Sequence, residues 1–419
     1  MDRASTAAIQ TAGGVADRPR LRVVRGGEEP AIKRVVVDLE KLRHPNCGLG
    51  RFSRHIAESL ERAAGDTGIE LVPFLHAAAP WSPPASRSLP AAFWRKESCL
   101  RWLRPLVRPL LGRRTTDLWH VTHQQAKYLP LDCRVPVLLT IHDLNFLHDT
   151  DASPRRIDRK LAAIQQLVTR SEAIVTDSRY VAEEVRLHLD LGHRPLHVVP
   201  LGLEAPAVPA ASRPDFLPPG RFLFSVGNCL PHKNFHVLLE LLAHLDDFRL
   251  VIAGKKTTPY GRFLASEIVR LGIGERVVMP GEVDDATRQW LYEHCEGFLF
   301  PSFAEGFGFP VLEAMQAGRP VFSSRWTSLP EVIGNHGFYF ESFSAESMAE
   351  VVRAGLRQID DDPGLVDSAR RHAASFSWQR TAADYLRIYR ELLDATGPAV
   401  VEHCRREAFP SGADRRRAA

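Results

Sequence analysis

Residues 300–315 read FPSFAEGFGFPVLEAM, and our interpretation of the fold starts from this stretch. An apolar strand ends at Pro301, a glycine-rich turn follows, and Pro310 stands where the first turn of a helix should begin. Glu305 lies on the turn, and Glu313 lies about one turn into the helix. Free N–H groups at a helix start attract anions, and carboxylates accept paired hydrogen bonds from vicinal hydroxyls. Either glutamate alone would be taken for a solvated residue, but the turn, the spacing and the helix start together predict a ligand site.

The sequence around this stretch alternates between apolar runs typical of buried parallel strands and segments with helical spacing. Two such series occur, separated by a segment with five prolines that excludes helix and central strand. We therefore predict an α/β chain of two Rossmann-like parallel-sheet domains facing across a cleft, with ligands beyond the carboxyl ends of the strands. The predicted strands are 33–39, 71–74, 118–121, 137–141, 173–176 and 197–199, then 222–226, 250–253, 277–279, 298–300, 320–322 and 338–340.

Composition and periodicity also predict the boundaries of these units. The C-terminal helix is expected either to pack back on the first domain or to close the second. The predicted units are a disordered extension (1–31), a first Rossmann-like domain (32–203), a Pro-rich linker (204–220), a second Rossmann-like domain (221–378), the C-terminal helix (379–395) and a disordered tail (396–419).

The composition narrows the class of protein. A chain of 419 residues can form two domains, and hydrophobic and charged shares of 44% and 25% are those of a globular protein. No run reaches the roughly 18 apolar residues of a membrane-spanning helix, and the N-terminus lacks a signal-peptide pattern. The six cysteines are widely spaced without a CxxC pair, which favours reduced thiols over disulfides or zinc. We therefore expect a cytoplasmic protein.

A second candidate is the loop Gly227–Asn234, GNCLPHKN, which follows the first strand of the second series. Loops between a strand and a helix bind phosphates, and Lys233 would neutralise a diphosphate as a point charge. An ordinary surface lysine near a helix start explains the pattern as well. That position is mildly unfavourable for a cation, which favours an anionic partner.

A third candidate follows the first strand, where Gly48 and Gly50 stand in a short loop before Arg51. Glycines there let the backbone approach a ligand closely, but a tight turn with positive φ explains them equally well. The pair lacks the third glycine of a dinucleotide fingerprint, which argues against an NAD-dependent oxidoreductase.

Two histidines, His142 and His123, follow strands and are expected to project into the cleft from the first sheet. Core or surface histidines are the default, and this position raises these two above the others. His120 and His123 have no third ligand at a recognisable spacing, so we predict no metal site. The D-x-D sequences 149–151 and 360–362 read as turn and helix-cap residues.

In their order along the chain, these segments resemble the retaining, metal-independent glycosyltransferases of family 4, which have the GT-B fold. The resemblance covers about residues 34–393, and its most specific feature is the E-x7-E element from Glu305 to Glu313. The other matching segments are 48–50, 141–143, 199–202, 227–234 and 376–378.

The resemblance implies roles for the candidate residues. Glu313 would hold the ribose hydroxyls of a nucleotide-sugar donor, and Glu305 would contact the transferred sugar. Lys233 would stabilise the departing diphosphate, and His142 would bind near the reacting sugar, so His142, Glu305 and Lys233 form the expected catalytic set. The other expected contacts are the donor-binding residues Gly48, Gly50, Arg51, Asn228, Phe307, Gly308 and Phe309, and His123 as a contact of the acceptor or sugar.

The resemblance also implies the reaction. The acceptor would attack on the same face of the sugar while a phosphate oxygen takes its proton, with no protein nucleophile and no cofactor. Many relatives carry Pro-Arg-Lys where this chain has Pro231-His232-Lys233, so Arg51 or Asn228 is expected to help hold the phosphate. The donor is expected to be a GDP-hexose, mannose by preference, with a UDP-hexose nearly equal.

The acceptor is expected to be a glycan or a lipid-linked intermediate in bacterial surface polysaccharide or lipopolysaccharide synthesis. A nucleotide-sugar epimerase of the same fold and a non-catalytic nucleotide-sugar-binding subunit are the alternatives. The E-x7-E element and the Lys233 loop favour the transferase.

The segment Arg95–Arg114 carries seven basic residues against one acid, with tryptophan, phenylalanine and leucine interleaved. This composition suits the surface of an anionic bilayer, although a solvated basic face explains it about as well. We expect a peripheral contact with the inner face of the membrane there. No recognition pattern for nucleic acid accompanies it.

Overall fold

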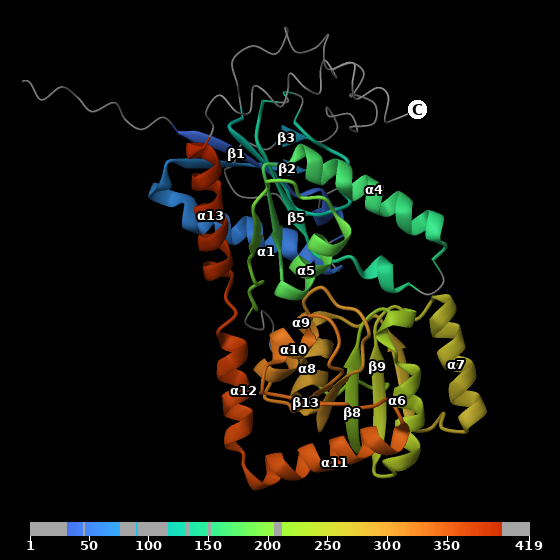
Figure 1. The fold of residues 1–419 in the computed structure, drawn as a ribbon. Helices are drawn as coiled ribbons and strands as arrows, with labels where there is room; N and C mark the ends of the chain where they lie inside the picture. Colours follow the sequence, from blue (N-terminus) through green and yellow to red (C-terminus); the bar gives the residue numbers. More distant parts are fainter. Residues whose placement is uncertain are drawn as a thin grey trace, which may run out of the picture.

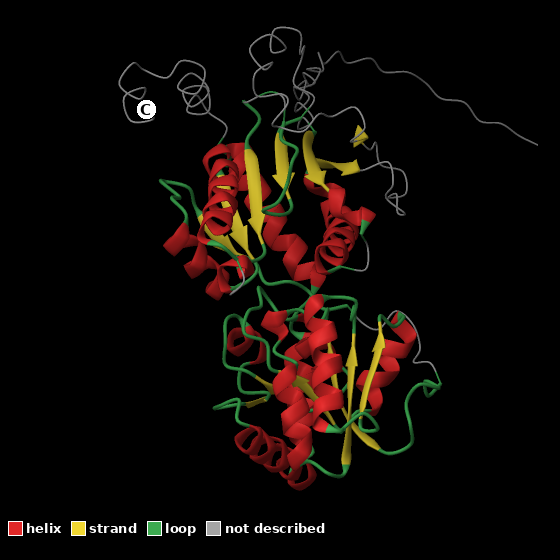
Figure 2. Cartoon of the chain, turned by 90° about the vertical axis from the view of Figure 1, so that its right-hand side faces the viewer, coloured by secondary structure: helices red, strands yellow, loops and turns green. Residues whose placement is uncertain are grey.

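A computed structural model describes residues 32–44, 47–75, 89–90, 116–130, 132, 134–149, 152–204 and 212–395. It contains two parallel sheets, one above the other in Figure 1, and Figure 2 shows the strands of each flanked by helices. The predicted fold of two Rossmann-like parallel-sheet domains is confirmed. The predicted extension, the tail and the basic segment Arg95–Arg114 lie outside the described residues.

The first sheet has seven strands in the order β3-β2-β1-β4-β5-β6-β7, all paired in parallel. Six of them match predicted strands to within two residues, whereas β3 has only two residues and left no signal. The strands are β1 Lys33–Asp38, β2 Ile69–Leu75, β3 Leu89–Pro90, β4 Leu118–Val121, β5 Val137–Ile141, β6 Ala173–Thr176 and β7 Leu196–Val198. The helices are η1 Glu40–Arg43, α1 Gly48–Ala64, η2 Gly65–Thr67, η5 Asn145–His148, α4 Pro154–Arg170 and α5 Arg179–His188.

The second sheet has six strands in the order β10-β9-β8-β11-β12-β13, again all parallel. They are β8 Arg221–Val226, β9 Phe248–Ala253, β10 Val277–Gly281, β11 Gly297–Phe300, β12 Val321–Ser323 and β13 Phe338–Tyr339. Its helices are η6 Pro231–Lys233, α6 His236–Leu241, η7 Leu242–His244, α7 Pro259–Leu271, α8 Asp285–His294, α9 Phe309–Gln316, α10 Leu329–Ile333, α11 Ala345–Asp361 and α12 Gly364–Ala374.

The strand order predicts one ligand-binding position at each sheet. In each sheet the first strand, β1 or β8, lies between two strands whose chain connections run in opposite directions. Ligands of open α/β sheets bind at such switch points, beyond the carboxyl ends of the strands. The loops after β1 and β4 and after β8 and β11 are therefore the expected binding loops.

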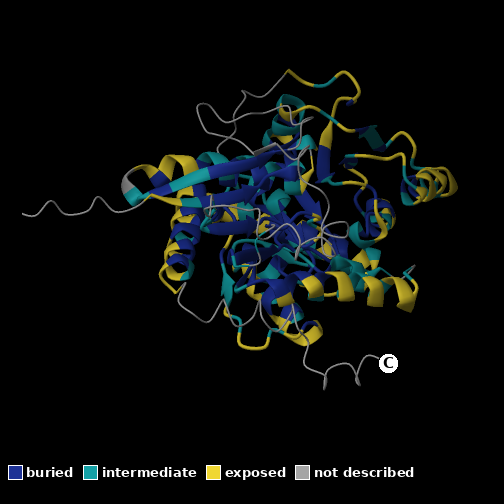
Figure 3. Cartoon of the chain, turned by 90° about the horizontal axis from the view of Figure 1, so that it is seen from above, coloured by how far each residue is buried: buried dark blue, intermediate teal, exposed yellow. Residues whose placement is uncertain are grey.

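The central strands are buried on both faces, as parallel strands covered by helices should be, whereas the edge strands β7 and β13 are half-buried (Figure 3). In the first sheet, every residue of β4, β5 and β6 is buried. In the second, Phe224, Phe298 and Phe300 fill the interior without exposure. Burial on two faces explains why these strands read as continuous apolar runs rather than as alternating patterns.

The last helix, α13 (Trp378–Asp394), leaves the second sheet and packs on α1 of the first (Figure 1). Its Tyr389 hydroxyl lies 2.7 Å from Nδ1 of His120, and its Tyr385 hydroxyl lies 3.0 Å from the Thr140 hydroxyl. Burial lowers the pKa of His120 to about 3, so His120 is a neutral core residue. The split between the two sheets and the path of α13 support the predicted domain boundaries, which remain a proposal.

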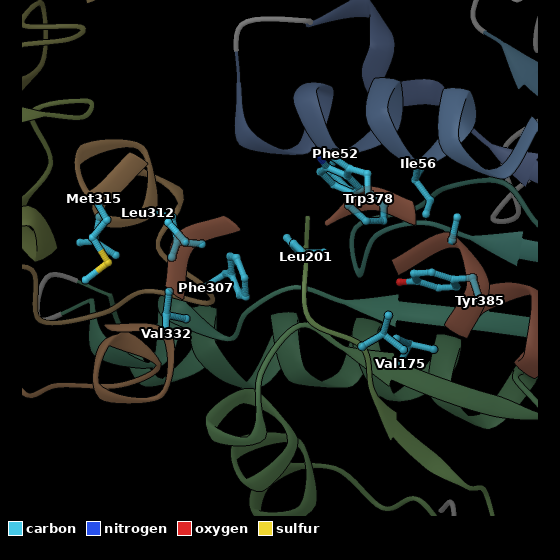
Figure 4. Packing of buried hydrophobic residues seen from close by; sticks show 14 of the residues in the cluster. Phe52, Ile56, Val175, Leu201, Phe307, Leu312, Met315, Val332, Trp378 and Tyr385 are labelled. Atoms are coloured by element: carbon cyan, nitrogen blue, oxygen red, sulfur yellow. The ribbon is translucent and has the colours of Figure 1, made fainter. Parts of the chain in front are cut away.

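Side chains from both sheets join one continuous hydrophobic cluster where the chain crosses between them (Figure 4). Phe52 of α1 lies 6.1 Å from Trp378, whose ring stacks on Phe309 of α9 at 6.3 Å between centroids. Gly202 lies against the backbone of Trp378 and leaves no room for a Cβ atom. The two sheets thus meet at a packed crossing of two chain segments.

Candidate active site

The turn between β11 and α9 forms as the sequence predicts. Pro310 lies in the first turn of α9, and Gly308 caps the helix with φ of 110°, a conformation that only glycine adopts without strain. Within the part of the chain that the structure describes, the amides of Gly306, Phe307 and Gly308 donate no hydrogen bond. The Phe307 ring is buried against Phe309, so Phe307 has only its backbone to offer a ligand.

Glu313 lies in the second turn of α9 and has two partners. Its Oε2 accepts a hydrogen bond of 2.8 Å from the Tyr292 hydroxyl, and its Oε1 lies 2.7 Å from the Arg51 guanidinium. Burial is the largest single influence and raises the pKa of Glu313, but the charges of Arg51 and Arg288 and the hydrogen bonds from Tyr292 and Arg51 together outweigh it and lower this pKa. Glu313 is therefore an ionised carboxylate, with accepting capacity for ligand hydroxyls.

Lys233 and Glu305 form the second ion pair at this edge of the sheet. Lys233 ends η6 after β8, and its Nζ lies 2.6 Å from Oε1 of Glu305 on the turn after β11. The ammonium also lies 5.1 Å from the centre of the Phe300 ring. Two loops that are far apart in sequence thus bring a cation and a carboxylate to the switch point of the second sheet.

The glycines after β1 differ from the expectation. Helix α1 begins at Gly48, so both Gly48 and Gly50 lie in its first turn, and neither has positive φ. The helix starts this early because Cys47 caps it, its sulfur accepting from the Gly50 amide. A Cβ at Gly48 would meet open space, and Arg51 on the same turn reaches Glu313 of the other sheet.

Asn228 lies two residues after the end of β8 and is exposed beyond the carboxyl end of that strand. It lies on the loop that also carries Lys233. Its position allows a phosphate contact, and no hydrogen bond of its side chain is present among the described residues.

His142 is buried at the carboxyl end of β5, and both of its ring nitrogens face acceptors. Nδ1 lies 2.6 Å from the Asp177 carboxylate, and Nε2 lies 2.8 Å from the backbone oxygen of Thr122. Burial, the largest single influence, lowers the pKa of His142, but the Asp177 charge and the hydrogen bonds to Asp177 and Thr122 together outweigh burial and raise it. Both ring nitrogens are thus engaged within the fold, whereas the sequence predicts a side chain that projects into the cleft.

His123 is also buried, but its ring is neutral. Burial, with the nearby charge of Lys41, lowers the pKa of His123 well below its usual value. Its Nδ1 accepts from the Gln125 amide, and its Nε2 lies 3.8 Å from Glu40. The expected contact of His123 with acceptor or sugar remains a prediction, since the ring is only 1% exposed.

The structure brings the two halves of the site together. Gly306 lies so close to the backbone oxygen of His142 that a Cβ atom would not fit, and its own oxygen accepts a bond of 2.9 Å from the Ser178 hydroxyl. The pair Arg51–Glu313 joins the sheets a second time. Candidate residues from both domains therefore form one site.

Sequence reasoning missed Tyr292 and Asp177, which hold Glu313 and His142 in place. Asp177 follows β6 directly, so the rule that singled out His142 would have found it. Tyr292 lies in α8, and no local pattern connects it with Glu313.

The described residues contain neither a metal-binding cluster nor a membrane-spanning helix. Among the residues that the structure describes, no three His, Cys, Asp or Glu side chains could hold a metal ion together. The aspartates 360 and 361 end α11 and Asp362 follows it, whereas Asp151 of the other D-x-D sequence is not described. In the same ranges, no helix is long and apolar enough to cross a membrane.

The chain is similar to known proteins in sequence and in fold. Residues 213–367 match the family model described as glycosyl transferases group 1. The chain is 24% identical to O-antigen chain mannosyltransferase B of Escherichia coli over 390 residues, which are 86% of this chain and all of that protein. The fold is similar to that of a sucrose-phosphate synthase from Thermosynechococcus elongatus, with a TM-score of 0.65, 18% identity and coverage of 87% and 100%. It is also similar to HepE of Anabaena in complex with UDP and glucose, with a TM-score of 0.64, 18% identity and coverage of 84% and 99%.

Proposed function

We propose a donor and a stereochemical course for this chain, which belongs to the glycosyl transferases group 1 family and is a nucleotide-sugar-dependent glycosyltransferase of the GT-B fold. The donor is a nucleotide-diphosphate hexose, GDP-mannose in the first place and a UDP-hexose in the second. The hexose is transferred with retention of configuration at its anomeric carbon and without a metal ion.

The observation that carries this proposal is the set of charges at the switch point of the second sheet. Glu313 is ionised and partly accessible, as a ligand of ribose hydroxyls must be. Lys233 lies on the loop after β8, beside the turn whose amides are unused. A diphosphate placed between them would meet a cation, the start of α9 and the Arg51 guanidinium.

The contacts of His142 support the course of the reaction. Asp177 and the Thr122 oxygen engage both ring nitrogens, so neither nitrogen is free to accept the proton of the acceptor. In the proposed step the bond between the anomeric carbon and the diphosphate oxygen breaks, and the acceptor oxygen bonds to that carbon on the same face. The acceptor proton passes to an oxygen of the leaving diphosphate, whose growing negative charge Lys233 stabilises. His142, held in place by Asp177 and Thr122, then positions this edge of the first domain near the sugar.

Relatives support the identity of the sugar and the acceptor. The Escherichia coli relative aligned over its full length is a mannosyltransferase of O-antigen chains, which favours mannose and a surface polysaccharide or lipopolysaccharide acceptor. The complex of HepE with UDP and glucose keeps a UDP-hexose in consideration. The cytoplasmic location and the membrane contact of Arg95–Arg114 stay predictions.

Isothermal titration of the purified chain with GDP, UDP, GDP-mannose and UDP-glucose, each with and without EDTA, tests the proposal. We expect one nucleotide family to bind, with EDTA having no effect. Loss of binding in EDTA would refute the metal-independent site, and binding of neither nucleotide would refute the proposed donor class. Glu296→Ala is the matched control, since Glu296 pairs with Arg221 at the opposite end of the same sheet.

A further inference from the structure

A short segment after β12 touches the turn that carries Glu305. Thr327 accepts a hydrogen bond of 3.0 Å from the Glu305 amide through its hydroxyl. The hydroxyl of the fully buried Ser328 is shared between the backbone oxygens of Glu305 and Phe307, at 2.9 and 3.0 Å. These bonds fix the backbone on both sides of the Glu305 side chain. We call residues Thr327–Glu331 the brace.

The backbone of the brace is strained where it meets the turn. Thr327 has φ of 57°, one of two positive values at non-glycine positions in the described residues. A β-branched residue is a rare occupant of this region, and such strain persists only where the surrounding structure enforces it. A glycine would fit the backbone better, but it would lack the hydroxyl that holds the Glu305 amide.

The other end of the brace reaches the first domain. The Glu331 carboxylate accepts hydrogen bonds from the Arg179 amide, at 3.0 and 2.8 Å, and from the Tyr180 amide, at 3.3 Å. These are the first two amides of α5, which have no partner within their own helix. A carboxylate at a helix N-terminus is also favoured by the helix dipole. Glu331 thus acts as a cap on a helix of the opposite domain.

The contact at α5 lies beside His142. Ser178, the cap residue of α5, donates its hydroxyl proton to the Gly306 oxygen at 2.9 Å and follows Asp177, the partner of the His142 ring. One chain segment therefore connects the residues that hold His142 with the turn that carries Glu305. The brace, which belongs to the second domain, connects the same two elements, the Glu305 turn and the start of α5.

Resting on the proposed function, we propose that the brace is a positioning element for glycosyl transfer. Glu331 holds the first amides of α5, and Thr327 and Ser328 hold the Glu305 turn in register with His142. The brace holds Glu305 through its backbone alone and makes no hydrogen bond or ion pair with the side chains of the pairs Lys233–Glu305 and Arg51–Glu313. We therefore expect it to affect the reacting geometry more than the capture of nucleotide. Glu331, Thr327 and Ser328 are positioning residues in this proposal.

Glu331→Ala tests the contact between domains, with Glu296→Ala as the control. Hydrogen exchange of the full chain should show the amides of Arg179 and Tyr180 exchanging at least tenfold faster in Glu331→Ala. Turnover, measured as the rate at which the sugar donor is converted to free nucleotide, should fall at least tenfold. The Kd for GDP or UDP should stay within twofold of the parent. Glu331→Gln, which keeps an acceptor oxygen, should recover part of both losses.

Two variants of Thr327 separate positioning from stability. Thr327→Gly relieves the positive φ and removes the hydroxyl, so we expect an unchanged or higher Tm together with slower turnover. Thr327→Ser keeps the hydroxyl and should turn over faster than Thr327→Gly. A residue with a purely structural role would not lower turnover while raising Tm.

Unchanged exchange at α5 in Glu331→Ala, or turnover within twofold of the parent, would overturn the positioning role. So would Thr327→Gly with the turnover of the parent. Failure of the parent to bind GDP or UDP would instead refute the proposed function, and the exchange measurement would still decide whether Glu331 holds α5.

Discussion

Two ion pairs lie on either side of the site, one in each domain, and they differ in the polar atoms that they leave free for a ligand. The Lys233–Glu305 pair of the second domain has side chains that are 14% and 12% exposed, and only one oxygen of the carboxylate is engaged by the lysine. The His142–Asp177 pair of the first domain is 7% and 2% exposed, and the ring has no unused nitrogen. The first pair can exchange partners when a ligand arrives, whereas the second is buried and fully engaged at the sheet edge.

The difference follows from where each pair lies in its fold. Lys233 and Glu305 stand on loops beyond the strand ends, while His142 and Asp177 directly follow buried strands of the same sheet. We infer that the second domain supplies adaptable contacts to the donor, and the first supplies a rigid surface against which the sugar reacts.

The largest effect is expected where the buried pair is broken. Asp177→Ala leaves the His142 ring without its counter-ion, so we expect a loss of about 3–5 kcal/mol in the free energy of unfolding. Urea denaturation measures it, with Glu296→Ala expected within about 0.5 kcal/mol of the parent. A loss in Asp177→Ala no larger than that of the control would contradict the expectation that the buried His142–Asp177 pair is a fixed part of the fold.

Breaking the Lys233–Glu305 pair should lower turnover. Lys233→Ala removes the cation expected at the leaving diphosphate, which predicts a fall in kcat of about 10²–10³-fold. Donor affinity should change much less, because the charge develops in the transition state. Steady-state kinetics with a binding isotherm separate the two. An effect confined to KM would assign Lys233 to uniform binding of the donor.

Donor affinity should depend on Glu313. Glu313→Ala removes a charged acceptor of ribose hydroxyls, which predicts a loss of about 1.5–3 kcal/mol in the free energy of nucleotide binding. Titration with the nucleotide that the parent binds gives this value directly. An isotherm equal to that of the parent would remove Glu313 from the donor site and leave it as the partner of Arg51 alone.

The smallest expected effect is on how the free energy of unfolding depends on pH. The raised pKa of His142 contributes stability that is present below the unfolded value of about 6.5 and is lost as pH rises through the folded pKa. The lowered pKa of Glu313 contributes stability present above about 4.5 and lost as pH falls through its folded pKa. Unfolding of the double variant His142→Gln with Asp177→Asn, followed from pH 6.5 to 9, should therefore depend less on pH than unfolding of the parent. An equal dependence would contradict the raised pKa of His142.

Much of the fold was readable from sequence, because parallel strands buried on both faces leave continuous apolar runs. Twelve strands were found this way, and β3 was missed because two residues cannot form such a run. The position of Gly48 was misjudged because Cys47 is a weak cap signal, so the start of α1 was placed too late. Tyr292 was missed because its partner comes from another helix.

The sequence by itself determined the two-sheet fold, the turn with Glu305 and Glu313, and the loop with Lys233, since each is a local pattern of strand, turn and helix start. The tertiary structure alone decided which charges meet. It paired Arg51 with Glu313 across the domains, buried His142 against Asp177 and set Glu331 on the first amides of α5. The physical reason is that burial and charge partners depend on packing between distant segments, and no local spacing encodes that packing.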